Sequence, residues 1–285
     1  HASYAWFSEN EQWLLTPSAQ WQTLEDRYDG LYRDGKDRRS ADHHGLGLGL
    51  QYSPSDNFRW QANIGEYFRE PSFYELFGDR GLHVGNDELL AEKGSNADIS
   101  LRWQHGQGEI QIGAFHSERD NLIATVFSAQ GIGHSENIGG ARVRGLELNA
   151  LQQLTPQWSA RFTATAQDAE NQSRIGAFYG KQQPGQAQLQ GALRLKHLRN
   201  NRSWWLEALA QDGKYYDTAN QLPAKEQLLF NAGVNIKTQQ WDISLTINNL
   251  TDKTVEDFNG FVKPGRTAHI SVSYQFSSNQ LSEEK

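Results

Sequence analysis

The segment 241–276 alternates strictly between apolar and hydrophilic residues in both of its arms. The apolar or aromatic positions are Trp241, Ile243, Leu245 and Ile247 in the first arm, and Ile270, Val272, Tyr274 and Phe276 in the second. Every position between them carries Asp, Ser, Thr, Asn, His or Gln. Because successive side chains point to opposite faces of a β-strand, each arm is predicted to be a strand with one apolar and one hydrophilic face.

The same period of two recurs along most of the chain. It is seen in the ranges 58–64, 99–103, 146–150, 158–164, 187–195 and 228–236. The pattern predicts an all-β fold of about thirteen strands, with no helix apart from a possible turn near Phe73–Phe77. The range 109–127 is expected to be one strand, longer than the ~5–6 residues usual for strands.

The predicted connections have two lengths, which alternate along the chain. The short ones cover 53–56, 105–108, 155–157, 197–202 and 238–240, and the long ones cover 30–43, 69–95, 128–139, 168–184, 213–224 and 250–265. Short and long connections are therefore expected at opposite rims of one sheet. Transmembrane barrels have this arrangement, with short periplasmic turns and long extracellular loops.

Aromatic residues gather where the short connections are expected. They are Tyr52, Phe58, Trp60, Trp103, Trp158, Trp204, Trp241, Tyr274 and Phe276. Trp and Tyr favour the lipid–water boundary because the ring is apolar while its N–H or O–H requires water. We predict that these residues form a girdle at the membrane interface.

A soluble β-sandwich or soluble β-barrel explains the alternation equally well, with the apolar face turned into a core. It does not explain aromatics repeated at one rim or two classes of connection. It also leaves unexplained an opposite face rich in Gln, Asn, Ser, Thr and Arg on strand after strand. A transmembrane antiparallel β-barrel accounts for all three features.

Composition narrows the class of protein further. The chain has 285 residues, a net charge of -7 and no cysteine, so disulfide and thiolate chemistry are excluded. Its basic residues are dispersed, which does not suggest a nucleic-acid partner. No run of 18 apolar residues is present, as a transmembrane helix would require. The chain starts at His1 without an initiator or signal peptide, so we expect it to be part of a longer precursor.

Three segments carry a resemblance to a known family. Residues 67–77 with 84–93 are similar to the signature R-x-P-S-x-x-E-L … G-N-x-x-L-x-x-E, with Glu70 and Ala91 where Ala and Pro are commoner. Residues 143–148 are similar to an x-x-G-x-E-x strand opening, and residues 248–276 to a closing hairpin. The chain resembles the C-terminal part of a TonB-dependent outer-membrane receptor.

The resemblance implies a 22-stranded barrel in the outer membrane of a Gram-negative bacterium, filled by an N-terminal plug domain. Residues 1–276 would supply about the last thirteen strands of the barrel, and residues 277–285 a C-terminal tail after the terminal aromatic. These strands alone would leave two unpaired edges, so we expect a fragment or one piece of a receptor whose rest lies elsewhere. The implied partners are the TonB complex, acting through a missing N-terminal segment, the plug domain, outer-membrane lipid and lipopolysaccharide, and a small-molecule ligand. That ligand would be scarce, such as a ferric siderophore, haem, vitamin B12 or another metal chelate.

The expected ligand-binding residues lie on long connections. They are Arg69, Tyr74, Glu75, Arg80, His83, Asn86, Tyr215 and Tyr216, with Glu70, Asp79, Asp87, Phe258 and Phe261 as further candidates. Arginine suits an anionic chelate, and tyrosine can stack on an aromatic ligand. The alternative is that the residues of 69–95 order their own loop or contact the plug, and we weight that structural role above direct ligand contact.

No catalytic constellation is visible, so an enzyme is not expected, and neither a cofactor nor a metal site is predicted. His43 and His44 are adjacent on a strand and should point to opposite faces. Asp29, Asp34 and Asp37 lack the spacing of a calcium loop. Active transport is the leading function. The alternatives are a passive porin-like or structural barrel, and a soluble β-sandwich binding module.

Overall fold

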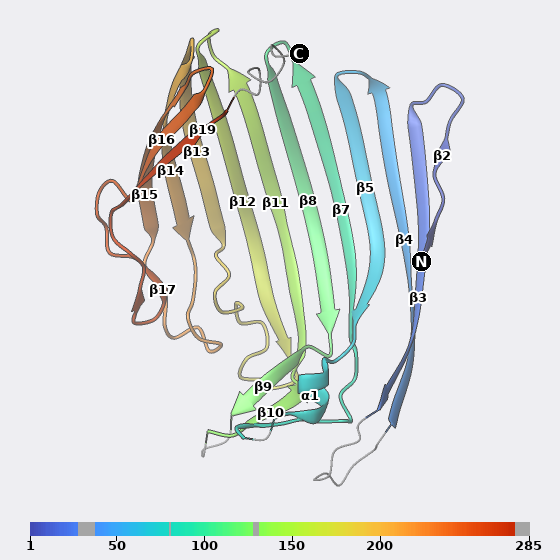
Figure 1. The fold of residues 1–285 in the computed structure, drawn as a ribbon. Coiled ribbons are helices and arrows are strands. Elements are labelled where there is room, and N and C mark those ends of the chain that lie inside the picture. Colours follow the sequence, from blue (N-terminus) through green and yellow to red (C-terminus); the bar gives the residue numbers. More distant parts are fainter. Residues whose placement is uncertain (28–37, 80, 128–130, 277–285) are drawn as a thin grey trace, which may run out of the picture.

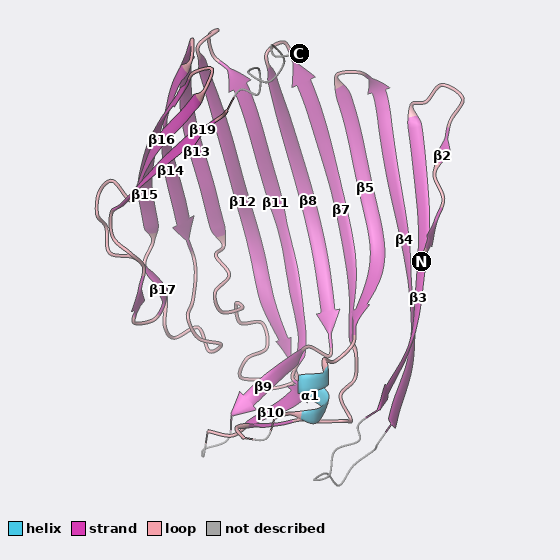
Figure 2. Cartoon of the chain, in the orientation of Figure 1, coloured by secondary structure: helices cyan, strands magenta, loops and turns pink. Residues whose placement is uncertain are grey.

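The chain folds into one long antiparallel sheet with loops and one short helix gathered at one rim (Figures 1 and 2). A computed structural model describes residues 1–27, 38–79, 81–127 and 131–276. The strands of the large sheet are β1 (Ala2–Ser3), β2 (Trp6–Phe7), β3 (Trp13–Arg27), β4 (Arg38–Ser55), β5 (Phe58–Arg69), β7 (Glu92–His105), β8 (Gly108–Asp120), β11 (Gly139–Gln153), β12 (Trp158–Ser173), β13 (Leu189–Arg199), β14 (Arg202–Asp212), β15 (Gln227–Lys237), β16 (Trp241–Asn248) and β19 (Thr267–Tyr274). The remaining elements are α1 (Phe73–Phe77), β6 (His83–Val84), β9 (Ile123–Phe127), β10 (Gly133–Asn137), β17 (Glu256–Phe258) and β18 (Phe261–Val262).

β1 and β2 are two pieces of one strand. Both pair with β3 in a single register, Ala2 with Ala19 and Phe7 with Leu14. The interruption lies opposite Pro17, whose carbonyl accepts from the Tyr4 N–H at 3.1 Å but which has no N–H to return. Counting this pair once, the sheet of 14 strands contains thirteen, as the alternation predicts. The predicted turn at Phe73–Phe77 is the helix α1.

The strand register sorts side chains onto two faces. One row of directly paired residues contains Leu50, Ala62, Ile99, Ala114, Leu146, Ala166 and Leu189. The neighbouring row, one residue along each strand, contains Gln51, Gln61, Ser100, Gly113, Glu147, Thr165, Gln190, Gln211 and Gln227. Adjacent rows point to opposite faces. We call the first the apolar face and the second the polar face.

The apolar face is largely exposed. Leu46, Ile64 and Leu146 each have more than 60% of their surface accessible, and Ile270 has 74%. Most of the buried apolar residues, such as Leu76 and Leu89, lie in the connections, and the two in the large sheet, Ala141 and Ala169, are small and lie near the loop ends of β11 and β12. A soluble sandwich would bury this face. An exposed apolar face extending along the whole sheet fits a lipid-facing barrel wall.

The sheet is open in the described part of the chain. Its order runs from β1 to β19, and within the described ranges the two end strands are not hydrogen-bonded to each other. The expectation that these strands do not close a barrel on their own is therefore confirmed. No helix in the described ranges is long and apolar enough to cross a membrane.

The prediction of one strand over 109–127 is wrong. β8 ends at Asp120, and β9 starts at Ile123 and pairs with β10 in a separate sheet of three strands. Asn121 between them has a φ of 56°, in the left-handed region that breaks a strand. Some strands also extend into segments that were predicted to be long connections. β7 begins at Glu92, inside the predicted connection 69–95, and β12 continues to Ser173, inside the predicted connection 168–184.

Candidate functional site

The long connections lie at one rim of the sheet, where two of them are joined (Figure 1). β6, between β5 and β7, pairs in parallel with β10, between β8 and β11. β10 also pairs antiparallel with β9. We call α1, β6, β9 and β10 with their connecting residues the loop cluster. It is built from two segments about 50 residues apart in the chain, as the pairing of His83 with Gly133 shows.

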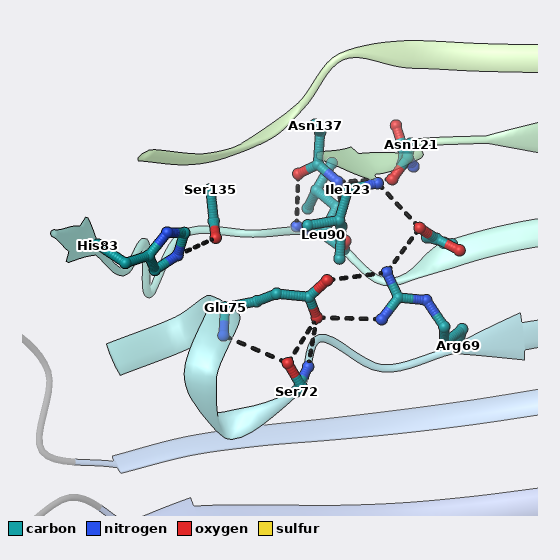
Figure 3. A network of polar contacts seen from close by, with 10 residues as sticks. Arg69, Ser72, Glu75, His83, Leu90, Asn121, Ile123, Ser135 and Asn137 are labelled. Atoms are coloured by element: carbon teal, nitrogen blue, oxygen red, sulfur yellow. Dashed lines mark hydrogen bonds and ion pairs between the residues drawn. The ribbon is translucent and has the colours of Figure 1, made fainter. Parts of the chain in front are cut away.

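Arg69 is the centre of a network that anchors the loop cluster to the sheet (Figure 3). Its guanidinium donates to both carboxylate oxygens of Glu75, at 3.0 and 3.2 Å, and to Glu92 Oε1 at 2.7 Å. The same Glu92 oxygen accepts the Ile123 N–H at 2.9 Å. One arginine therefore connects the end of β5, the helix, the start of β7 and the start of β9.

The helix α1 is held by a capping box. The Glu75 N–H donates to Ser72 Oγ at 3.3 Å, and the Ser72 N–H donates to Glu75 Oε2 at 2.7 Å. Burial works against ionisation of Glu75, but the hydrogen bonds from Arg69 and Ser72 outweigh it and hold the pKa of this carboxyl below its usual value. Gly85 lies so close to the helix that a Cβ there would be 2.4 Å from the Leu76 carbonyl oxygen. Arg69 and Ser72 of the Arg-x-Pro-Ser segment and Gly85 of the Gly-Asn segment thus take part in building the cluster.

A second set of contacts fixes β6 against β10. His83 Nε2 lies 2.8 Å from Ser135 Oγ, and both residues are at least 95% buried. Asn86 Nδ2 donates to the Ser135 carbonyl at 3.1 Å. Tyr74 stacks on His83 at a centroid distance of 4.3 Å while half of its surface stays exposed.

The structure therefore gives several predicted ligand residues an internal role. Four of them use their side-chain polar groups in hydrogen bonds that hold the loop cluster together: Arg69, Glu75, His83 and Asn86. Tyr74 keeps an exposed ring. Arg80 lies outside the described residues. Glu70 contacts His43, so the two candidates stand together at the loop end of β4 and β5.

Tyr215 and Tyr216 lie in a different place, beside the hairpin β17–β18. The Tyr216 hydroxyl donates to the Glu256 carbonyl at 3.4 Å. Lys214, which is 93% buried, donates to the Asp257 carbonyl at 3.2 Å. Phe258 and Phe261 pair across the hairpin and are 63% and 72% exposed. The tyrosines and phenylalanines are thus near one another, but in the sheet order β12 and β13 separate β14, which precedes the tyrosines, from β11, which follows the loop cluster.

A hollow of about 390 Å³ lies on the polar face, at the loop end of β13, β14 and β15. Its polar lining consists of Thr163, Thr165, Gln190, Gln211, Gln227 and Lys263. Lys263 follows β18, so the hairpin contributes to this hollow. We did not predict these residues. The sequence did contain a signal for them, because hydrophilic residues of the alternating pattern occur at the strand ends that adjoin long connections.

The Asn248–Lys253 segment of the closing hairpin is a structural turn. Asn249 has a φ of 52°, and its N–H donates to Asn231 Oδ1 at 2.9 Å. The Asn249 side chain exchanges hydrogen bonds with the backbone of Lys253. The Arg266 N–H donates to Asp252 Oδ1 at 2.7 Å. The segment that carries part of the resemblance therefore shapes the chain between β16 and β19.

Two groups of residues in the sequence carry side chains of metal-ligating types. His43 stacks on Phe68 at a centroid distance of 4.8 Å and contacts Glu70, while Asp29, Asp34 and Asp37 lie outside the described residues. In the described ranges, no three His, Asp or Glu side chains are grouped to hold a metal ion.

The predicted girdle residues lie at the rim of short turns. Trp158 and Trp204 pack edge to face at 4.7 Å, and Trp241, Tyr274 and Phe276 form a chain of rings with 4.7 Å between successive centroids. Phe58 stacks on Trp103 at 5.9 Å, and Tyr52 pairs with Trp60 across β4 and β5. Trp13 extends this set by stacking on Tyr52 at 4.1 Å.

A family model described as "TonB dependent receptor-like, beta-barrel" matches residues 2–250. The chain belongs to this family. Among curated relatives of this TonB-dependent receptor chain, the vitamin B12 transporter BtuB of Vibrio vulnificus is 24% identical over 260 residues, which are 86% of this chain and 39% of the relative. The chain spans 39% to 41% of the length of the vitamin B12 transporters that it matches.

Solved structures show the same fold. The copper transporter OprC superposes with a TM-score of 0.81 over 96% of this TonB-dependent receptor chain and 46% of its own, at 17% identity. The ferric yersiniabactin uptake receptor FyuA from Yersinia pestis superposes with a TM-score of 0.78 over 96% and 45% of the two chains, at 19% identity. The resemblance inferred from the three sequence segments is thus confirmed.

Proposed function

We propose that the chain forms the C-terminal wall of an outer-membrane receptor that imports a scarce ligand, a metal chelate or a comparable cofactor such as vitamin B12. The observation that carries the proposal is the separation of an exposed apolar face from a continuous polar face over the whole sheet. The polar face would line a lumen occupied by a plug domain. Energy would come from the TonB complex through a segment outside this chain. The protein acts in transport and not as an enzyme.

The aromatic girdle supports placement in a membrane. Register carries Tyr52 on β4 across five strand steps to Ala164 on β12, where Trp158 lies six residues nearer the turn. With about 3.3 Å per residue and about 4.8 Å between strands, one ring at constant depth requires strands tilted by roughly 40°. Transmembrane barrels have this tilt. Lipid would then cover the apolar face, and lipopolysaccharide would meet the charged residues beyond it, such as Arg144 and Asp168.

Two adjacent tryptophans test the assignment of the faces. Trp204 is 41% exposed on the apolar face, whereas Trp205 packs under the Arg194 guanidinium at 4.3 Å on the polar face. The full-length receptor is reconstituted in brominated lipid, which quenches the fluorescence of tryptophans in contact with it. Trp204→Phe should then remove a component of the tryptophan fluorescence that the bromine quenches. Trp205→Phe should remove only unquenched fluorescence. Equal quenching of both signals would contradict a lipid-facing apolar surface.

The transport function is tested by uptake in cells. A strain lacking the receptor gene is complemented with the full-length protein, and accumulation of radiolabelled cyanocobalamin and of ⁵⁵Fe-loaded siderophores is measured with and without TonB. Accumulation of one ligand that requires both proteins is expected. Uptake that is unaffected by loss of TonB would instead indicate a passive porin-like barrel.

A further inference from the structure

The hollow on the polar face contains several polar side chains that have no hydrogen-bond partner among the described residues. Within the described ranges, no protein group bonds the side-chain amides of Gln190 and Gln211 or the hydroxyls of Thr163 and Thr165. These groups come from three neighbouring strands, β12, β13 and β14, and line one space. An amide carries two donors and an acceptor with two lone pairs, so the hollow offers a dense set of both kinds.

Part of the polar face further along the same strands is paired internally. Arg194 Nε donates to Glu207 Oε1 at 2.9 Å, and Asn231 Nδ2 donates to Glu207 Oε2 at 3.1 Å. A second hollow, between β3, β4 and β5, also contains paired groups, since Gln61 donates to Gln51 and Asn63 donates to Asp98. The first hollow differs from these paired groups because the amides of Gln190 and Gln211 lie on adjacent strands and neither has a hydrogen-bond partner among the described residues.

The hollow offers little positive charge. Lys263 is its one charged lining residue, and the Lys263 ammonium already lies 3.0 Å from Asp257 Oδ1. The nearby Arg194 is paired with Glu207 and covers the Trp205 ring. A polyanionic ligand that lost its water here would leave charge uncompensated, which is costly. Amide and hydroxyl groups of an uncharged ligand would instead be matched.

The position of the hollow agrees with ligand entry. Gln190 and Gln211 lie one residue from the loop end of their strands, and Gln227 is the first residue of β15. Gln227 Nε2 donates to the Glu256 carbonyl at 3.2 Å, and Tyr216 reaches the same carbonyl, so the hairpin β17–β18 is attached at the edge of the hollow. The exposed Phe258 and Phe261 stand on that hairpin.

We propose that this hollow is a ligand subsite for an uncharged chelate or cofactor rich in amide or hydroxyl groups, and that it disfavours polyanionic chelates. The inference rests on the proposed transport function. Gln190 and Gln211 would bind such groups directly, while the hairpin would cover the bound ligand from the loop side.

The test uses the purified full-length receptor and four probes. Cyanocobalamin and the neutral hydroxamate ferrichrome represent the proposed class, and haem and the trianionic ferric enterobactin represent the excluded one. Equilibrium binding should detect one of the two neutral probes. Gln190→Leu and Gln211→Leu should each weaken its binding about five- to tenfold, the size expected for one lost hydrogen bond. Gln61→Leu is the matched control, on the same face and register row but in the second hollow, and should leave affinity within about twofold.

Several results would overturn the subsite. The first is tighter binding of ferric enterobactin or haem than of both neutral probes. The second is a receptor that binds neither of the two neutral probes. Unchanged affinity in both glutamine variants together with weaker retention of the plug domain would show that the hollow holds the plug. In each case, TonB-dependent uptake of whichever ligand does bind would leave the proposed transport function standing, so the two failures are distinguishable.

Discussion

The loop cluster and the hollow on the polar face differ in whether their polar side chains are hydrogen-bonded within the protein. Where the loop cluster joins the sheet, Arg69 bonds Glu75 and Glu92, and these carboxylates also accept backbone N–H groups. In the hollow, Gln190 and Gln211 line open space without a partner among the described residues. The residues that look most like a functional motif therefore build structure. The residues best placed to meet a ligand belong to no motif.

This contrast has a physical basis. Arg69 and two carboxylates must be mutually compensated once they are partly removed from water, so their positions are interdependent. A glutamine on a strand requires only an alternating pattern, and its neutral amide tolerates either water or a ligand. Recognition chemistry can thus vary at such positions without disturbing the wall.

The largest effect that would test the comparison is expected from Arg69→Ala. It would leave Glu75 and Glu92 without their common cation, and the helix without its attachment to β7. We expect the local opening free energy of the loop cluster to fall by about 1–2 kcal/mol, less than for a fully buried pair because the Arg69 side chain is 42% exposed. Hydrogen exchange at the Leu76 and Ile123 amides measures this loss.

Arg144→Ala supplies the matched control. Arg144 pairs with Asp168 at 2.8 Å, but the two side chains are 56% and 41% exposed. Its removal should change the same amides by less than about 0.5 kcal/mol. Equal effects of the two variants would contradict a special role of Arg69 in the loop cluster.

A smaller effect is expected from acidification. The pKa of Glu75 is held below its usual value, so the folded cluster binds its proton less readily than the unfolded chain does. The stabilisation from this carboxylate is present above the unfolded pKa of about 4.3 and is lost as the pH falls through the folded value. Exchange protection of α1 should therefore decrease below about pH 4. In Glu75→Gln that pH dependence should be reduced, with protection already low at pH 7.

The smallest effect on stability is expected from Gln211→Leu, because its amide has no protein partner to lose. The free energy of unfolding of the full-length receptor, measured by thermal unfolding, should change by no more than about 0.5 kcal/mol, as for an ordinary surface substitution. Strong destabilisation would mean that the amide supports the wall, which would remove the difference between the two regions. The same variant's effect on ligand affinity is independent of this measurement.

Much of the wall could be predicted from the residues alone. Trp241, Ile243 and Leu245 alternate with hydrophilic residues, and a strand has only two faces on which to place them. Short turns between such strands impose antiparallel neighbours, so strand order followed from chain order. The loop partners could not be predicted in this way. Nothing local links His83 to Ser135, because their contact depends on two connections meeting across β7 and β8.

The sequence by itself therefore determined the two faces, the two rims and the family of this protein, since these follow from period-two patterning and from short motifs. Only the tertiary structure decided which polar side chains form hydrogen bonds within the protein and which remain available to bind a ligand. The Arg69 guanidinium is used in internal hydrogen bonds because three strands and a helix meet at this residue. Gln190 and Gln211 remain available because register aligns them across β13 and β14 in a hollow that they line without a partner among the described residues. Register and loop packing act over long sequence separations, where local patterns carry no information.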